Sequence, residues 1–430
     1  MPYLLESFHI TYVIFFIRNT KKVNSIMSKI KVGLLREGKI PIDRRVALPP
    51  AHAVRVMEQF PGVELLVQQS DIRCYTDQDY EHEGVKVIES LEECDIVLGV
   101  KEVPVDALMA EKTYFFFSHT IKKQPYNREL LQQVLHKNIT LVDYETLTDK
   151  KGKRLIAFGR WAGIVGAYNS IWTYGKRYNL FHLRRAHECF DLDDLRSEFK
   201  EVNLPPIKII LTGGGRVAKG AMEVLMGMGI RKVTPRQFLE EHFEFPVFAQ
   251  LNVRNYNIKK SGVEFSRKEF YQSPDLYDAD FVKYCRCADI LIASAFWDPR
   301  APVLFERKDI LEDDFKITVI ADITCDIDGS IPSTKRPSTI EDPVYDYNPS
   351  DDQVESPFSD EANITVMAVD NLPCELARDA SGSFGDELIE NVLPSLLGEV
   401  KDDVIGRATI AKGGKLTEPF AYLQDYVDGN

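Results

Sequence analysis

The chain has 430 residues, of which 44% are hydrophobic and 28% charged. This balance is typical of a globular protein, and the length exceeds one compact core, so we expect two domains. The net charge of −13 at pH 7 disfavours broad contact with nucleic acid or with an anionic membrane surface, whereas local arginines can still bind small anions. The seven cysteines show no metal-ligand spacing, so we expect reduced thiols, a cytoplasmic protein and no metal site.

The first 26 residues differ from the rest of the chain. Their apolar run at residues 12–17 is too short to span a bilayer, and the positive charge that precedes the apolar part of a signal peptide is missing. The recognisable sequence restarts at Met27 with SKIKVGLLRE. We therefore expect residues 1–28 to form a disordered extension.

Short β-rich runs alternate with helical stretches over the first third of the chain. Strands separated by helices pair in parallel through right-handed crossovers, so this alternation predicts a parallel sheet. The expected strands cover residues 30–35, 63–68, 95–100, 114–118 and 139–144, and the expected helices cover residues 51–60, 87–94 and 127–137. A longer helix is expected over residues 159–180, where Gly163 and Gly166 suit close packing against another helix.

The same alternation restarts after residue 206, with expected strands over residues 207–213, 231–234, 288–294, 317–324 and 363–369. The predicted fold class is therefore α/β, with two Rossmann-like domains, parallel sheets and a cleft between them. The expected division is a substrate (catalytic) domain over residues 29–160, a dinucleotide-binding domain over residues 161–370, and a return of residues 371–430 to the substrate domain. The polar segment 341–363 is expected to be a solvated loop, with a lid over the cleft as the alternative.

The glycine-rich stretch GGGRVA, residues 213–218, follows an expected strand and opens an expected helix. This is the context that the dinucleotide-binding fingerprint requires. Gly213 permits the tight turn, Gly215 lets the backbone approach a pyrophosphate, and the helix N-terminus offers unpaired N–H groups. We expect a nicotinamide dinucleotide here, with a purely structural turn as the alternative.

The choice between NAD and NADP depends on the end of the next strand. An acid there would accept the ribose 2′-hydroxyl of NAD, but the expected strand at residues 231–234 is followed by Pro235 and Arg236. An arginine suits a 2′-phosphate, so the sequence favours NADP. Glu240 and Glu241 follow closely and keep NAD as the alternative.

Ionisable residues end three expected strands of the first domain. Arg36, Lys101 and His119 stand at the carboxyl ends of these strands, where ligands of open parallel sheets bind. A lysine and a histidine can both move protons near neutral pH, and burial lowers the pKa of a lysine toward that range. The sequence therefore predicts a catalytic site at this edge, although each residue alone would be an ordinary surface group.

Several longer motifs carry a family resemblance. They are REGKIPIDRRVALPP, GVKEVP, FFSHTIKKQ, LVDYETLTDKKGKRLIAFGRWAG, IADITCDIDGSI and MAVDNLPCELARDAS. Together they resemble the saccharopine dehydrogenase (L-lysine-forming) and lysine–2-oxoglutarate reductase family, which belongs with alanine dehydrogenase and the nicotinamide transhydrogenase α chain. The resemblance covers residue 29 to about residue 425. HTIKKQ, FGRWAG and a long insert between Thr234 and Ala288 make it closer to the reductase domain of bifunctional lysine-degrading enzymes.

The resemblance implies roles for individual residues. Lys101 matches the general base and His119 the general acid, with Glu102 and Glu145 as acids that tune this pair. The implied substrate site contains Arg36 and Arg154, whose guanidinium groups would hold carboxylates, with Gln124, Phe158, Thr324, Cys325 and Asp326. The expected cofactor site contains Lys153 (an arginine in one branch of the family), Gly213, Gly215, Arg216, Arg236, Phe296, Ile323, Val369, Asp370, Asn371 and Leu372.

The expected function is an oxidoreductase that interconverts saccharopine with L-lysine and 2-oxoglutarate by hydride transfer to or from NAD or NADP. The expected partners are these small molecules, not nucleic acid or a membrane. One alternative is an alanine dehydrogenase-type enzyme, for which a second substrate arginine such as Arg154 would be surplus. The other is a nicotinamide-binding subunit without turnover, which intact Lys101 and His119 disfavour. The direction in the cell, the amino acid condensed and the oligomeric state are left open by the sequence.

Overall fold

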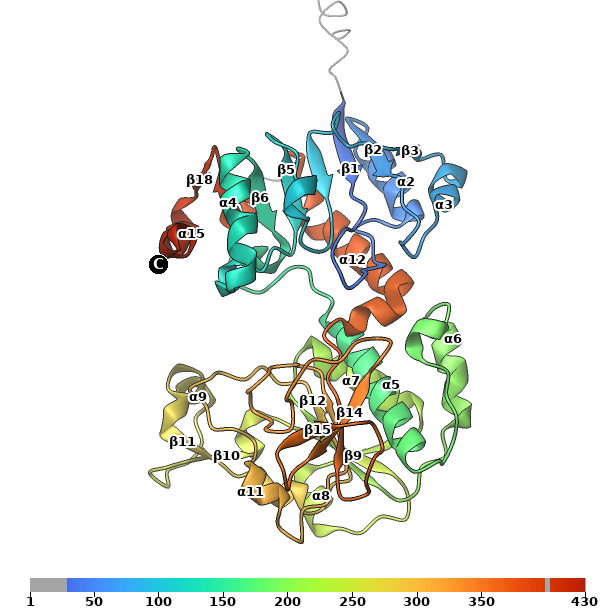
Figure 1. Ribbon diagram of the computed structural model, residues 1–430, viewed down its shortest axis with the longest axis vertical. Helices are drawn as coiled ribbons and strands as arrows, with labels where there is room; N and C mark the ends of the chain where they lie inside the picture. The colour runs from blue at the N-terminus through green and yellow to red at the C-terminus, as the bar shows by residue number, and fades with distance from the viewer. Residues whose placement is uncertain (1–28, 399–402, 430) are drawn as a thin grey trace, which may run out of the picture.

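Two eight-stranded sheets form the framework of the chain, each in its own lobe (Figure 1). The structure is a computed structural model that describes residues 29–398 and 403–429. Each sheet is mainly parallel and ends in two antiparallel strands at one edge. The predicted α/β class with two mainly parallel sheets is therefore confirmed. The extension expected at residues 1–28 lies outside the described residues.

The first sheet has the strand order β18-β17-β6-β5-β4-β1-β2-β3. Its strands are β1 (Ile30–Leu34), β2 (Val63–Gln68), β3 (Lys86–Ile88), β4 (Ile96–Leu98), β5 (Thr113–Phe116), β6 (Thr140–Asp143), β17 (Thr409–Lys412) and β18 (Lys415–Leu416). Helices α2 (Pro50–Gln59), α3 (Asp77–His82) and α4 (Arg128–His136) connect its parallel strands. Because β17 pairs with β6, strands from both ends of the described chain share this sheet.

The helix expected over residues 87–94 is wrong. Val87 and Ile88 belong to β3, where Val87 pairs with Val67 of β2. The crossover helix is α3, which begins after Thr76 with a capping box between Thr76 and Asp79. A short run rich in valine and isoleucine can form a strand as well as a helix. Here the run forms a strand because it pairs with β2 at the edge of the sheet.

The second sheet has the strand order β15-β14-β16-β13-β12-β7-β9-β8. Its strands are β7 (Lys208–Thr212), β8 (Arg231–Val233), β9 (Val247–Leu251), β12 (Ile290–Ala293), β13 (Val319–Asp322), β14 (Val344–Asn348), β15 (Gln353–Glu355) and β16 (Ile364–Met367). The strand expected at residues 231–234 is present as β8, but it lies at the edge of the sheet, and β9 is the strand that pairs with the glycine-rich strand β7. The reason is hydrophobicity: Val247, Phe248 and Ala249 are fully buried in β9, whereas Arg231 and Lys232 of β8 are exposed.

The polar segment 341–363 is neither a solvated loop nor a lid. It contains β14, which pairs antiparallel with β16, and β15. Tyr345, Asp346 and Tyr347 of β14 are fully buried. Asp346 tolerates burial because its carboxylate accepts hydrogen bonds from the Thr365 hydroxyl at 2.7 Å and from the Ser359 backbone N–H at 2.7 Å. These bonds explain how a segment rich in aspartate enters a sheet.

Helix α5 (Gly159–Arg177) joins the lobes and packs on α7 (Arg216–Gly227) at very short range (Figure 1). A Cβ atom at Gly163 would lie 1.9 Å from the carbonyl oxygen of Val217, and one at Gly220 would lie 2.0 Å from that of Arg160. Only glycine fits at these two positions, which confirms the expected close helix packing. The contact holds the start of α7 against the helix that leaves the first lobe.

The remaining elements lie around these two sheets. Helix α12 (Ala377–Asn391) runs back across the junction of the lobes (Figure 1), and the hairpin of β10 (Asn257–Lys259) and β11 (Tyr277–Ala279) projects from the second lobe beside α9 (Arg267–Gln272). The shorter helices are α6 (Leu192–Ser197), α8 (Pro235–Glu240), α10 (Val282–Cys285), α11 (Arg307–Ile310), α13 (Leu393–Leu396), α14 (Val404–Ala408) and α15 (Gln424–Asp428). Within residues 29–398 and 403–429, no helix has the length and apolar character needed to cross a membrane. The same residues contain no group of three His, Cys, Asp or Glu side chains that could hold a metal ion.

Candidate active site

Residues that follow the strands of one sheet contact residues that follow the strands of the other. The guanidinium of Arg45 donates a hydrogen bond from Nη2 to the Asn371 side chain at 2.9 Å. The guanidinium of Arg216, at the start of α7, donates one to the carbonyl oxygen of Arg154 at 2.7 Å. The carboxyl ends of the two sheets therefore face one shared junction, which is where ligands of such sheets bind.

His119 and Glu102 form a tight pair at this junction. The Nδ1 atom of His119, after β5, lies 2.5 Å from Oε1 of Glu102, after β4, and the Lys39 ammonium lies 2.7 Å from the other oxygen of Glu102. Burial opposes ionisation of Glu102, but the bonds from His119 and Lys39 lower its pKa to about 2. An ionised carboxylate can only accept hydrogen bonds, so Nδ1 of His119 is the donor and Nε2 is left for a ligand.

Lys101 lies beside this pair, at the end of β4. Its backbone N–H and that of Val100 donate to the two carboxylate oxygens of buried Glu37, at 2.9 and 2.7 Å. Its ammonium forms no ion pair with any residue that the structure describes. Burial lowers the pKa of Lys101, and the positive charges of Arg45 and Lys39 lower it further. Lys101 is therefore closer to its neutral, proton-accepting form than an exposed lysine is.

A buried cation lies close to Lys101. Arg45 is 3% exposed and forms a two-point ion pair with Asp43 through Nε and Nη2, at 3.0 and 2.5 Å. Burial opposes ionisation of Asp43, but Arg45 holds the pKa of that carboxyl well below its usual range. The guanidinium also lies 4.1 Å from the ring centroid of Phe158, which stacks on Phe384 at 4.7 Å. Phe158 thus fixes the position of Arg45.

Two more of the expected substrate-site residues are Arg154 and Gln124. Nη2 of Arg154 lies 2.8 Å from Oε1 of Glu145, and its side chain is 40% exposed, so the rest of the guanidinium is open to a ligand. The hydroxyl of Tyr126 donates to the side chain of Gln124, and it lies within the electrostatic range of Lys39 and Glu102.

Arg36 is not part of this group. Its side chain is exposed and lines a small pocket with Gln69, Ser70, Asp71 and Asp77. Its backbone N–H donates to the side chain of Gln68 at the end of β2. The arginine whose charge acts on Lys101 is Arg45, so we expect Arg45 and not Arg36 to lie at the substrate.

Three further residues of this group were not predicted from the sequence: Glu37, Lys39 and Asp43. All three stand in the motif REGKIPIDRRVALPP. Asp43 and Arg45 are two residues apart in an extended segment, and this spacing places two side chains on the same side. That spacing is the signal that could have identified the pair.

The glycine-rich turn borders a cavity of about 840 Å³. Gly213 has φ of 97°, which favours glycine, and a Cβ atom at Gly215 would meet no atom within 4 Å. Helix α7 begins at Arg216 without a side-chain cap, so the N–H groups of its first turn are open toward the cavity. These features fit the phosphates of a dinucleotide.

The loops after β13 and β16 lead from this cavity toward Arg45. Ile323, Thr324, Cys325 and Asp326 follow β13, and Val369, Asp370, Asn371 and Leu372 follow β16. Cys325 has φ of 53°, and so does His119 in the opposite domain. A left-handed conformation is uncommon for residues other than glycine and is often found at functional sites. Both residues border the shared junction.

Two expected cofactor residues lie elsewhere. Arg236 is on α8, is 83% exposed and forms an ion pair with Glu240 at 2.8 Å. It does not line the cavity, because it follows the edge strand β8 and not β9. Lys153 is exposed, in a turn held by Asp149. Phe296, after β12, does line the cavity.

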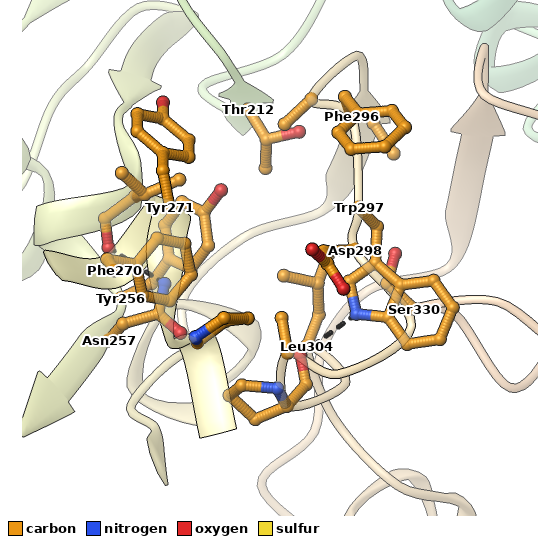
Figure 2. A pocket seen from close by; sticks show the side chains of 16 residues that line it. Thr212, Tyr256, Asn257, Phe270, Tyr271, Phe296, Trp297, Asp298, Leu304 and Ser330 are labelled. Atoms are coloured by element: carbon orange, nitrogen blue, oxygen red, sulfur yellow. Dashed lines mark hydrogen bonds between the residues drawn. The ribbon is translucent and has the colours of Figure 1, made fainter. Parts of the chain in front are cut away.

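A second cavity of about 120 Å³ adjoins the first. Figure 2 shows Tyr256, Phe270 and Tyr271 on one side and Phe296 and Trp297 on the other. Val253, Tyr271, Ala295 and Phe296 line both cavities. The two spaces are therefore neighbours at the ends of β9 and β12.

Comparisons with known proteins agree with this arrangement. Residues 33–165 match the family model "Alanine dehydrogenase/PNT, N-terminal domain". The chain is 30% identical to the mitochondrial alpha-aminoadipic semialdehyde synthase of Mus musculus, over 91% of this chain and 47% of that protein. It is 25% identical to saccharopine dehydrogenase [NAD(+), L-lysine-forming] of Yarrowia lipolytica, over 86% of this chain and 92% of that protein.

A solved structure shows the same fold. An L-alanine dehydrogenase superposes with a TM-score of 0.61 at 18% identity, covering 93% of this chain and 99% of the other. The chain spans about half the length of the semialdehyde synthases it matches. The same kind of protein is indicated by the order of the motifs along the sequence, by the two mainly parallel sheets and by these relatives. The chain therefore carries an alanine dehydrogenase/PNT N-terminal domain at residues 33–165, and over most of its length it is similar to alpha-aminoadipic semialdehyde synthases and saccharopine dehydrogenases.

Proposed function

We propose that this chain is a nicotinamide-dependent oxidoreductase that interconverts saccharopine with L-lysine and 2-oxoglutarate. Residues of the first lobe bind the substrate and move protons, and the second lobe binds the dinucleotide. The observation that carries this proposal is the arrangement of Lys101, with a lowered pKa and no acidic partner among the described residues, beside His119, which Glu102 orients.

The dinucleotide supplies the acceptor or donor of the hydride. Gly213, Gly215 and the start of α7 hold its phosphates, and the loops after β13 and β16 hold the end that reaches the junction. This assignment is supported by the φ angle of Gly213, the uncapped start of α7 and the cavity in front of them. The N-terminal domain match at residues 33–165 covers the other lobe.

Lys101 acts as the general base in the oxidative direction. It accepts the proton of the secondary amine of saccharopine as that C–N bond becomes an imine. A lysine serves this role only when it is partly neutral, and burial together with Arg45 and Lys39 supplies this condition.

His119 acts in the hydrolysis that follows. Its Nε2 atom takes a proton from water as the water oxygen attacks the imine carbon, which gives a carbinolamine. It then gives the proton to the amine nitrogen, and its freed Nε2 atom accepts the hydroxyl proton of the carbinolamine as the carbonyl forms and the C–N bond breaks, leaving L-lysine and 2-oxoglutarate. Glu102 holds Nδ1 and stabilises the protonated ring between these steps.

Two arginines favour a substrate with more than one carboxylate. Arg45 and Arg154 lie on different segments, and Nη1 of each is bonded to no residue that the structure describes, so each can still donate to a substrate carboxylate. Alanine and pyruvate carry one carboxylate each, so this pair argues against an alanine dehydrogenase-type activity. Lys101 and His119 argue against a subunit without turnover.

The proposal is tested by following oxidation of NADH and of NADPH in the presence of 2-oxoglutarate with a panel of amino acids. L-lysine is expected to support the fastest rate, with ornithine and pyruvate plus ammonia as comparisons. Turnover with pyruvate and ammonia but not with 2-oxoglutarate and lysine would replace the proposal by the alanine dehydrogenase-type activity.

A further inference from the structure

The strand beside the glycine-rich strand decides which residues face the adenosine ribose of a dinucleotide. That strand is β9 and not β8. It ends at Leu251, and Asn252, Val253 and Arg254 follow it in the wall of the glycine-turn cavity. A Cβ atom at Gly214 would lie 2.9 Å from Oδ1 of Asn252, so this loop touches the turn itself.

The wall contains no acid that could hold an unmodified ribose. Among its lining residues in the described chain there is no aspartate or glutamate. At the position directly after β9, where NAD-binding domains place an acid, stands Asn252, whose side chain forms a capping box with Asn255.

Two arginines enter the same wall from different segments. Arg254 follows β9, and Arg267 is the first residue of α9, in the insert between β9 and β12. Both side chains are exposed, and neither forms an ion pair with a residue in the described ranges 29–398 and 403–429. Most other arginines of the second lobe have such partners; Arg236 with Glu240 and Arg300 with Asp298 are examples.

We propose that Arg254 and Arg267 bind the 2′-phosphate of NADP(H) and that they are the residues which select this cofactor over NAD(H). The inference rests on the proposed dinucleotide binding in the second lobe and names the part of that site that reads the ribose. A guanidinium group is suited to a phosphate because it donates two parallel hydrogen bonds. Two unpaired arginines in a wall without acids attract a dianion and leave a neutral 2′-hydroxyl without an acceptor.

The neighbouring aromatic cavity supplies the place for the adenine ring. Tyr271 and Phe296 line both cavities and are 56% and 87% exposed (Figure 2). Flat aromatic side chains stack on a base whatever its substituents. Tyr271 lies one turn after Arg267 on α9, with the Arg267 guanidinium 5.6 Å from its ring centroid. The same insert therefore contacts both the adenine and the 2′-phosphate.

Two ligands that differ only in the 2′-phosphate test this inference without any substrate. Binding of adenosine 2′,5′-bisphosphate and of 5′-AMP is measured by isothermal titration calorimetry for the full chain and for Arg254→Ala, Arg267→Ala, Phe296→Ala and Arg236→Ala. The wild-type chain is expected to bind the bisphosphate at least about 10-fold more tightly, the scale of one or two charge-assisted bonds. Each of the first two variants is expected to lose most of this preference while it keeps its affinity for 5′-AMP, which also shows that the variant is folded.

The other two variants are the controls. Phe296→Ala is expected to weaken both ligands alike, by about 5-fold or more, since it removes a stacking surface and no charge. Arg236→Ala is expected to change neither. No preference in the wild-type chain, a preference that survives in the double variant Arg254→Ala/Arg267→Ala, or its loss in Arg236→Ala would overturn the inference. Because no amino acid is present, the outcome is independent of whether lysine and 2-oxoglutarate are turned over.

Discussion

Arg45 of the first lobe and Asn371 of the second are joined by a hydrogen bond of 2.9 Å, and Asp43 holds both side chains. Arg45 is one of the two charges that most lower the pKa of Lys101. The loop that follows β16 in the dinucleotide-binding sheet is thus connected to the residue we propose as the base. This connection supports the proposal that hydride transfer and proton transfer take place at the same junction.

The ion pair of Asp43 and Arg45 is expected to behave as a buried pair. Arg45→Met leaves the Asp43 carboxylate buried without its cation, which is expected to cost about 3–5 kcal/mol of unfolding free energy. The double variant Asp43→Asn/Arg45→Met removes both charges and is expected to be more stable than Arg45→Met alone. Urea denaturation of the four chains of this cycle measures the effect. Purely additive losses would show that the two side chains do not act as a pair.

Arg154 and Arg36 form a matched test of the substrate site. Arg154→Ala is expected to raise the KM for 2-oxoglutarate by about 10-fold or more, because it removes a charged contact of about 1.5–3 kcal/mol. Arg36→Ala serves as the control, since Arg36 lies in another pocket, and a change within about 2-fold is expected for an exposed residue. The opposite order of the two effects would return Arg36 to the substrate site.

Two glycines near the dinucleotide turn are expected to respond in different ways. Gly163→Ala places a Cβ atom 1.9 Å from a carbonyl oxygen of α7 and is expected to lower the Tm by several degrees, since overpacking costs about 1–3 kcal/mol. Gly215→Ala meets no protein atom within 4 Å, so its Tm is expected to stay unchanged while the Kd for NADPH rises. Unchanged NADPH affinity in Gly215→Ala would show that the phosphates do not lie against this turn.

Glu37 is expected to make stability depend on pH. Burial raises its pKa from 4.5 to about 8, with Asp43 adding to the shift. Between these two values the folded chain keeps a proton that the unfolded chain releases, so this group lowers stability as the pH rises from about 5 to about 8. Glu37→Gln lacks this effect. The Tm of the variant minus that of the wild type is therefore expected to increase over this range, and a constant difference would contradict the assignment.

The sequence predicted most of the sheet but not the order of its strands. The apolar runs at residues 63–68 and 207–213 contain the mostly buried strands β2 and β7, and their hydrophobicity reveals them. The run at residues 247–251 was missed because no helix of ordinary length separates it from β8. Whether β8 or β9 takes the position beside β7 depends on how much of each strand the whole fold buries. The local sequence pattern does not show this.

The sequence predicted only part of the candidate site, because some of its residues come together only through the folded path of the chain. Lys101 and His119 lie three residues after the ends of β4 and β5, so the rule about strand ends identifies them. Arg45 stands nine residues after Arg36 in a segment without regular structure, and only the folded path brings it beside Lys101. The same holds for Arg254 and Arg267, which come together through the insert that packs beside the glycine-rich turn.

The most direct test of the proposed mechanism is the pH dependence of kcat for saccharopine oxidation in Lys101→Met. In the wild type, kcat is expected to rise with pH as Lys101 loses its proton and then to level off. Lys101→Met is expected to lower kcat by about 10²-fold or more and to lose this rising limb, while the Kd for the dinucleotide and the profile of the exposed control Lys153→Met stay unchanged. A Lys101→Met enzyme that keeps most of its kcat and the rising limb would contradict the assignment of Lys101 as the base.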